Sequence, residues 1–225
     1  MSSVYMTEEE QLESIKKWWA RYGNMITLAI TLVLLCVAGY RYYYWHQAKI
    51  TQQASSAYEH MIAEISSQNN QGVRSYANEL TTNYKKSVYA DAAHLSLAKL
   101  YITKNKFDKA IVELQNVADH SKMPALRQIA KIRIARLLAA TTAYDKALNE
   151  LNQVEDKVYL PVVNELKGDI YTAQGNYQQA IQSYQLAMQE VKTNGMGNAF
   201  LEMKRNELVV KKQKNQAQEK KIEAT

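Results

Sequence analysis

Side chains that could act as nucleophiles, metal ligands or proton-transfer groups are scattered along this chain. Its histidines are His46, His60, His94 and His120, and their spacing matches no metal-ligand motif. The single cysteine, Cys36, lies in an apolar stretch, and neither a Gly-x-Ser-x-Gly nor a Gly-Lys-Ser/Thr motif occurs. We therefore predict that the protein is not an enzyme and that it holds no metal or other cofactor.

Three short patterns have both a functional and a structural interpretation, and we favour the structural one for each. His94 lies at a repeated helical position, where a packed core histidine is more common than a catalytic one. His60 and Glu64 are one helical turn apart, which is more typical of a surface pair than of an acid/base couple. Gly195 begins the sequence Gly-Met-Gly-Asn, which lacks the preceding strand and the third glycine of a phosphate loop. We interpret this fragment as a linker between helices.

An uncharged, mostly apolar stretch separates Arg21 from Arg41, and it is close to the roughly 20 residues that a helix needs to cross a bilayer. Aromatic residues crowd its C-terminal end, as is typical of the membrane interface, whereas a cleaved signal ends in small residues. These aromatic residues are Tyr40, Tyr42, Tyr43, Tyr44 and Trp45. We therefore predict a permanent transmembrane anchor at residues 22–45.

The charges that flank this stretch indicate its orientation. Lys16, Lys17 and Arg21 precede it, against Arg41 and Lys49 after it. Because an excess of Lys and Arg usually remains in the cytoplasm, we expect a cytoplasmic N-terminus and a main domain on the other side of the membrane.

The composition of the main domain favours helices. Two prolines and seven glycines in the whole chain leave little material for a turn-rich β fold, and Ala, Leu, Gln, Glu and Lys favour helix. Much of the net charge of +6 lies in the tail after Met203, which has no aromatic residue for stacking on bases. We predict no nucleic-acid binding, and we interpret residues 211–225 as a basic, flexible tail.

An internal repeat organises the main domain. Segments that begin at Ala93, Ala130 and Val163 align, and each has one small residue in a first helix and another twelve positions later. These small residues are Ala98, Ala135 and Gly168, followed by Ala110, Ala147 and Ala180. Two antiparallel helices approach closely only where side chains are small, so these positions predict the crossing of each helical pair.

Turn residues and prolines support the same division. Asn105, Thr142 and Gly175 fall between the paired helices, and Pro124 and Pro161 fall where a first helix can begin. Upstream, a degenerate pair is expected from Ala54, with Ala77 placed 33 residues before Ala110. Downstream, a closing helix is expected from Ala199 to about Val210.

The repeats resemble the tetratricopeptide family, whose period of about 34 residues lies between the offsets of 37 and 33 seen here. The third unit matches best, although Asn164 and Lys167 depart from the pattern. Its matching residues are Gly168, Tyr171, Gly175, Tyr177, Ala180, Tyr184 and Ala187. We therefore predict an all-α protein in which one N-terminal transmembrane helix precedes a tetratricopeptide-repeat-like α-solenoid.

Two blocks that flank the anchor extend this resemblance. The first is the Gln11 to Trp19 block, which predicts a short amphipathic helix, and the second contains the pairs Arg41-Tyr42 and His46-Gln47. With the repeats, they resemble the YfgM family of ancillary subunits of the bacterial SecYEG translocon. The resemblance implies an inner-membrane protein with cytoplasmic residues 1–21 and a periplasmic repeat domain at residues 46–210.

The same resemblance implies the partners: the SecYEG translocon, a PpiD-type periplasmic chaperone, and exported polypeptides that the repeat domain assists. A membrane-tethered signalling adaptor, whose N-terminus binds a cytoplasmic stress-response regulator, is the alternative. The oligomeric state is left open.

The family's repeat geometry also predicts a binding surface. In tetratricopeptide arrays the first helices line the concave face, so residues near the first small position of each unit should face a groove. The candidate groove residues are Leu95, Lys99, Ile102, Ile132, Arg136, Glu165 and Asp169. This groove would be apolar and basic in the first two repeats and acidic in the third, which suits extended chains with apolar side chains and an exposed carboxylate.

Overall fold

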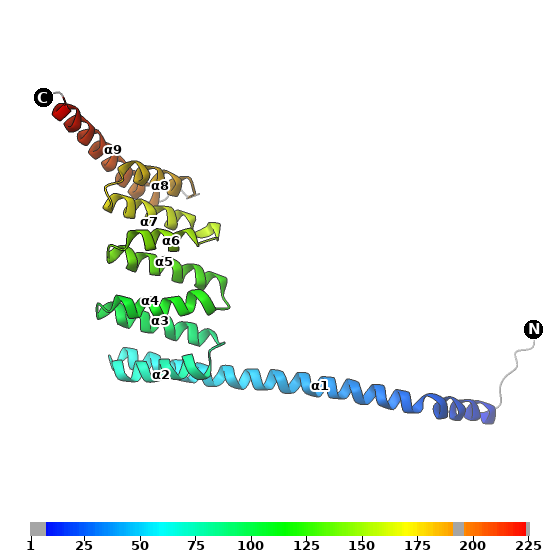
Figure 1. Ribbon diagram of the computed structural model, residues 1–225. Helices are drawn as coiled ribbons and strands as arrows, with labels where there is room; N and C mark the ends of the chain where they lie inside the picture. The colour runs from blue at the N-terminus through cyan, green and yellow to red at the C-terminus, as the bar shows by residue number, and fades with distance from the viewer. Residues whose placement is uncertain (1–7, 191–195, 224–225) are drawn as a thin grey trace, which may run out of the picture. The chain divides into compact units, whose positions relative to one another are not determined.

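The computed structural model describes residues 8–190 and 196–223, and within these ranges the secondary structure is helical without a strand (Figure 1). This confirms the predicted all-α class. The helices are α1 (Glu8–Ser66), α2 (Asn70–Asn83), α3 (Val88–Thr103), α4 (Phe107–His120), α5 (Pro124–Ala140), α6 (Tyr144–Asn152), the 3-10 helix η1 (Lys157–Tyr159), α7 (Leu160–Ala173), α8 (Tyr177–Glu190) and α9 (Met196–Glu223).

Two compact units divide the chain, Met1–Gln53 and Ala54–Thr225. The first contains most of α1, which is long and apolar enough to cross a membrane. Residues Gln11 to Trp19, for which the sequence predicted a short amphipathic helix, belong to the continuous helix α1. No helix-breaking residue lies between the amphipathic segment and the apolar segment, so the helix runs through both.

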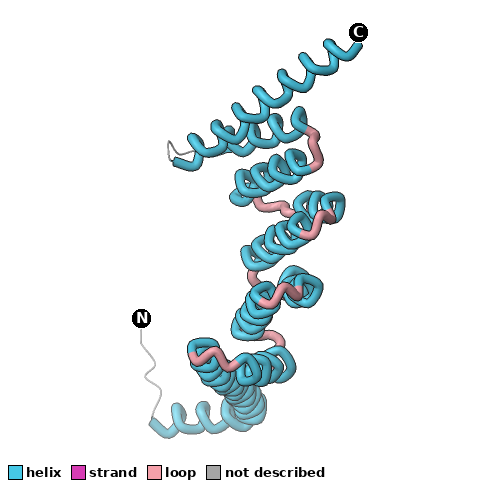
Figure 2. The backbone as a smooth tube through the Cα atoms, turned by 90° about the vertical axis from the view of Figure 1, so that its left-hand side faces the viewer, coloured by secondary structure: helices cyan, strands magenta, loops and turns pink. Residues whose placement is uncertain are grey.

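The second unit is the repeat domain, in which short loops join the helices (Figure 2). The pairs α3/α4, α5/α6 and α7/α8 coincide with the three predicted repeats. The residue in the middle of each turn has a positive φ: 55° at Asn105, 61° at Thr142 and 77° at Gly175. This left-handed conformation ends the first helix and reverses the chain, as the turn residues predicted.

Buried small residues mark the crossing of each pair, as expected. Ala98, Ala135 and Gly168 in the first helices are buried, and Ala110, Ala147 and Ala180 in the second helices are fully buried. Each buried cluster also includes residues of the helix that follows the pair, so the pairs form one continuous core.

The first pair, made by the end of α1 and by α2, departs from the predicted alignment. Gln68 has a φ of 57° and occupies the turn position, which places Val73 rather than Ala77 at the position of Ala110. Met61 then stands at the position of Ala98, and it is fully buried. The sequence aligned Ala77 instead because it is the small residue 33 positions before Ala110.

The closing helix is longer than the sequence predicted. Helix α9 runs from Met196 to Glu223, so it continues beyond Val210 and through most of the basic tail. Gly197, which was expected to break the chain, lies inside α9, whereas Gly195 lies outside the described residues. Lys, Gln and Glu dominate the tail and have good helix propensity, which explains the continuation.

Candidate protein-binding groove

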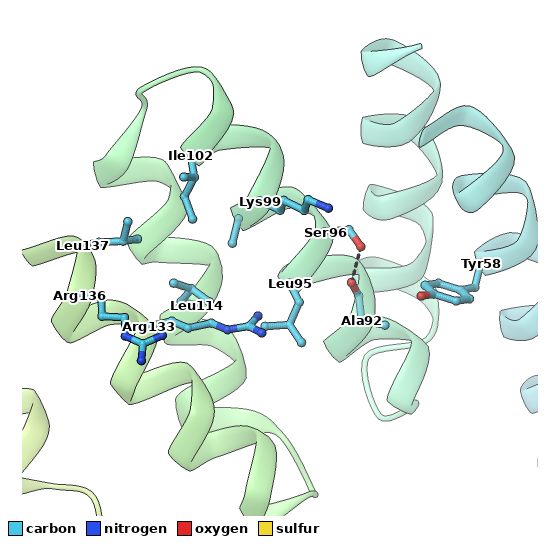
Figure 3. Close-up of a pocket in the computed structure, with 11 residues that line it drawn as sticks. Tyr58, Ala92, Leu95, Ser96, Lys99, Ile102, Leu114, Arg133, Arg136 and Leu137 are labelled. Atoms are coloured by element: carbon cyan, nitrogen blue, oxygen red, sulfur yellow. Dashed lines mark hydrogen bonds between the residues drawn. The ribbon is translucent and has the colours of Figure 1, made fainter. Parts of the chain in front are cut away.

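A groove with a volume of about 550 Å³ lies on the repeat domain, between α3 and α5 (Figure 3). Tyr58 from the end of α1 and Leu114 from α4 also line it. The lining residues are thus drawn mostly from the first helices of successive pairs, as the tetratricopeptide geometry predicts.

The floor of the groove is apolar. Leu95 and Ile102 come from α3, one on each side of the buried Ala98, and Leu137 comes from α5. Leu95 and Ile102 are half-buried, so each offers part of its side chain to a ligand. The hydroxyl of Ser96 donates to the carbonyl oxygen of Ala92 at 2.8 Å, so its proton is already used inside α3 (Figure 3).

Three exposed cations border this floor: Lys99 on α3, and Arg133 and Arg136 on α5. Arg133 extends along the groove toward Leu95 (Figure 3). No carboxylate of the described residues lies within ion-pair distance of any of the three. The groove therefore combines apolar surface with positive charge that the described chain does not neutralise.

Four of the seven predicted groove residues meet here: Leu95, Lys99, Ile102 and Arg136. Ile132 does not, because it is only 5% exposed and packs in the core between α5 and α7. Arg133 also lines the groove, although it is not among the seven predicted residues. It lies three residues before Arg136, so the helical periodicity could have identified it.

The acidic end of the predicted groove, Glu165 and Asp169 on α7, lies apart from this cavity and has a partner within the chain. Lys204 Nζ of α9 lies 3.0 Å from Glu165 Oε1 and 2.8 Å from Asp169 Oδ1. The same ammonium group lies 4.8 Å from the centre of the Phe200 ring. The carboxylates that were expected to face a ligand therefore bind α9.

This ion-pair cluster shifts the pKa of two residues. Partial burial alone would lower the pKa of Lys204, but hydrogen bonds to Asp169 and Glu165 outweigh burial and raise it. Burial raises the pKa of Tyr184, and the hydrogen bond that its hydroxyl donates to Asp169 at 2.6 Å raises it further. Both residues therefore keep their protons beyond the usual pH range, which preserves the contact between α7, α8 and α9.

The histidines have structural contacts. His94 Nδ1 lies 2.7 Å from Glu113 Oε2, which links α3 to α4, and both side chains are mostly buried. His60 stacks on Tyr76 with ring centres 5.4 Å apart, which links α1 to α2. Within residues 8–190 and 196–223, no group of three or more His, Cys, Asp or Glu side chains is placed to hold a metal ion.

Comparison with known proteins places most of the chain in a family. A family model described as a tetratricopeptide repeat-like domain matches residues 16–210. An ancillary SecYEG translocon subunit of Escherichia coli (strain K12) is 24% identical over 92% of this chain and 99% of the relative. The proteins of the same name from Neisseria gonorrhoeae and from Buchnera aphidicola subsp. Schizaphis graminum are 25% and 32% identical, over 92% and 67% of this chain and 99% and 76% of the relatives.

The similarity includes both the apolar part of α1 and the helical pairs, because the family match begins at residue 16 and ends in α9. It covers far more than half of the chain, and the Buchnera relative exceeds 30% identity over most of its own length. This chain therefore belongs to the YfgM family of tetratricopeptide repeat-like proteins.

Proposed function

We propose that this protein is a membrane-anchored, non-catalytic accessory subunit of the Sec translocon. In this proposal α1 anchors the chain in the bacterial inner membrane, with its N-terminus in the cytoplasm and the repeat domain in the periplasm. The groove between α3 and α5 binds segments of a PpiD-type chaperone or of exported polypeptides.

The names of the relatives support the association with the translocon, since proteins called ancillary SecYEG translocon subunits match 92% of this chain. The apolar helix α1 supports the anchor, and the excess of cations before it supports the orientation. The observation that carries the binding role is the groove itself, in which Lys99, Arg133 and Arg136 border an apolar floor without a carboxylate partner among the described residues.

An extended polypeptide fits the chemistry of this groove. Its apolar side chains would cover Leu95 and Ile102, and an Asp, a Glu or a terminal carboxylate would pair with the arginines. Arg133 and Arg136 are one turn apart on the same helix, so both guanidinium groups can reach one acidic segment. Segments of this kind occur in unfolded exported chains and in chaperones alike, so the groove could serve both.

Crosslinking in intact cells tests this proposal. A photoreactive residue at Leu95, in the groove, is compared with one at Val112, which is 60% exposed on α4 and does not line the groove. We expect products with the chaperone or with exported chains from Leu95, much weaker products from Val112, and translocon subunits in the purified complexes. Recovery of a cytoplasmic regulator instead, without translocon or chaperone, would contradict the proposal and favour the signalling adaptor.

A further inference from the structure

Five residues at the C-terminal end of the apolar part of α1 form one continuous surface, which we call the basic aromatic stripe. It consists of Arg41, Tyr42, Trp45, His46 and Lys49. Arg41, Trp45 and Lys49 follow one another at intervals of four residues, and Tyr42 and His46 form the adjacent row at the same interval. At 3.6 residues per turn, both rows lie on one side of the helix.

Four of these side chains, Tyr42, Trp45, His46 and Lys49, form a chain of contacts. Lys49 Nζ lies 5.5 Å from the centre of the Trp45 ring, and the rings of Tyr42 and His46 are stacked at 6.1 Å with an angle of 9°. Tyr42 also lies 6.3 Å from Trp45, so the aromatic rings join the two rows. All five side chains are exposed.

The stripe has no negative charge near it in the sequence. No aspartate or glutamate occurs between Glu13 and Glu59, and no ion pair forms on Arg41 or Lys49 among the described residues. At the other end of the apolar segment, by contrast, the cation Lys17 pairs with Glu13 at 3.2 Å. The charge of the stripe is therefore available to an anionic ligand.

We propose that the basic aromatic stripe binds the phosphate headgroup of an anionic phospholipid in the leaflet at the C-terminal end of the span. The proposal rests on the membrane anchoring proposed above. The guanidinium group of Arg41 can donate two hydrogen bonds to phosphate oxygens, and the ammonium group of Lys49 adds a second positive charge. Trp45 and Tyr42 keep this end of the helix at headgroup depth, where the phosphate lies.

Charge complementarity favours an anionic lipid over a zwitterionic one. Attraction of a basic residue to an anionic membrane surface is worth about 1 kcal/mol, a factor of about five in local concentration. Arg41 and Lys49 together therefore predict an enrichment of anionic lipid of several-fold around Trp45. This enrichment should decrease with added salt, because exposed charges are screened.

Fluorescence quenching of Trp45 by brominated lipids measures this enrichment directly. The chain has three tryptophans, so Trp18→Phe with Trp19→Phe leaves Trp45 as the only one. The full chain is reconstituted into vesicles of phosphatidylcholine and phosphatidylglycerol of fixed composition, in which only one of the two lipids carries bromine. For equal mole fractions of label, we expect several-fold more efficient quenching by brominated phosphatidylglycerol.

Charge variants show whether the stripe causes the preference. Arg41→Gln with Lys49→Gln should abolish it, whereas the matched control, Lys16→Gln with Lys17→Gln, should retain it. Equal quenching by both labelled lipids, or a preference that survives removal of the two stripe charges, would overturn the lipid site and leave the anchor intact. Absence of quenching by either lipid would instead overturn the anchor, and the lipid site with it.

Discussion

Gly168 in α7 approaches Tyr184 in α8 so closely that a Cβ atom at Gly168 would lie 2.5 Å from Cε1 of the tyrosine ring. The ring is only 2% exposed, and its hydroxyl is hydrogen-bonded to Asp169. It therefore cannot move aside without loss of packing or of this hydrogen bond. The glycine is required here by the size of the residue that faces it.

The equivalent positions of the other pairs show the same compensation of size. In the two preceding repeats, the residue on the first helix is larger than Gly168 and the residue on the second helix is smaller than Tyr184. These pairs are Ala98 with Leu114, and Ala135 with Leu151. In the first pair, the larger residue lies on the first helix instead of the second. The buried Met61 is on α1 and the buried Ala77 is on α2. The volume available at each crossing is thus shared differently by the two helices.

This relationship predicts that Gly168→Ala lowers the free energy of unfolding. Overpacking against Tyr184 costs about 1 to 3 kcal/mol, and the better helix propensity of alanine returns at most about 1 kcal/mol. In a Tyr184→Leu background, which reproduces the crossing of the preceding repeats, the alanine should be neutral or stabilising. Urea unfolding of the wild-type protein, the two single variants and the double variant measures both effects. If Gly168→Ala lowers the free energy of unfolding equally in both backgrounds, the steric explanation is refuted.

A second prediction concerns the crossing in the second repeat. Ala147 is fully buried between α5 and α6, so Ala147→Leu should force the helices apart and cost about 1 to 3 kcal/mol. The neighbouring Lys146 is exposed, and Lys146→Leu should change stability little. Thermal melting of the repeat domain, residues 54–225, compares the two. Equal melting temperatures would contradict the assignment of Ala147 to the crossing.

The sequence was sufficient to predict the turns and crossings of the last three pairs, because their small residues and turn residues recur at fixed positions. The predicted alignment of the first pair was wrong because Gln68 is not a typical residue for a left-handed turn. In addition, the large residue Met61 and the small residue Ala77 lie on the opposite helices from those in the other pairs. These features depend on contacts between helices, which the periodicity of a single helix does not contain.

The candidate groove was predictable only in part for a similar reason. The repeat alignment was sufficient to identify Lys99 and Arg136 as groove residues. The orientation of α5 about its own axis, which the alignment does not give, places Ile132 in the core and Arg133 in the groove. The partner of Glu165 and Asp169 could not be foreseen, because Lys204 lies more than 30 residues further along the chain. Only the packing of α9 on α8 brings it to α7.

The contacts of Lys204 predict a loss of stability in alkali. The folded state raises the pKa of both Lys204 and Tyr184, so it holds their protons more tightly than the unfolded state does. Their contribution is therefore complete below about pH 10 and is lost as the pH rises above it. Urea unfolding between pH 8 and pH 11 should show this decrease, with a smaller decrease for Lys204→Met.

Hydrogen exchange locates the same effect. Near neutral pH, Lys204→Met should increase amide exchange in α9 while the helices α3 to α6 stay protected, because the ion pairs join α9 to α7 alone. Lys146→Met, in which an exposed lysine is removed from α6, is the control. Unchanged exchange in α9 would mean that its packing on α8 suffices to hold it.

A fourth prediction concerns the topology, and it needs an exposed labelling position in the repeat domain. Ser121 is only 4% exposed and donates to Asp91 at 2.7 Å, whereas the adjacent Lys122 is exposed. In a Cys36→Ala background, we expect an impermeant maleimide to label a cysteine at Lys122, but not one at Ser3, in cells with a permeabilised outer membrane and an intact inner membrane. The reverse pattern would place the repeat domain in the cytoplasm.

The last prediction tests the charge of the groove. Lys99→Glu with Arg136→Glu replaces two exposed cations by anions, so the melting temperature should stay nearly unchanged. Binding of an acidic segment should weaken by roughly 1 to 2 kcal/mol, about fivefold to thirtyfold, because each attraction becomes a repulsion. The yield of crosslinks from Leu95 measures this loss.

A matched variant separates the groove from the net charge. Lys85→Glu with Lys86→Glu makes the same change of charge at two exposed lysines in the loop before α3, outside the groove. It should leave the crosslinks from Leu95 intact, because attraction to an acidic segment falls off with distance and is screened by salt. If the folded Lys99→Glu and Arg136→Glu protein crosslinks as well as this control, the basic residues of the groove do not bind the partner. The binding surface must then lie on the second helices of the pairs or on the apolar part of α1.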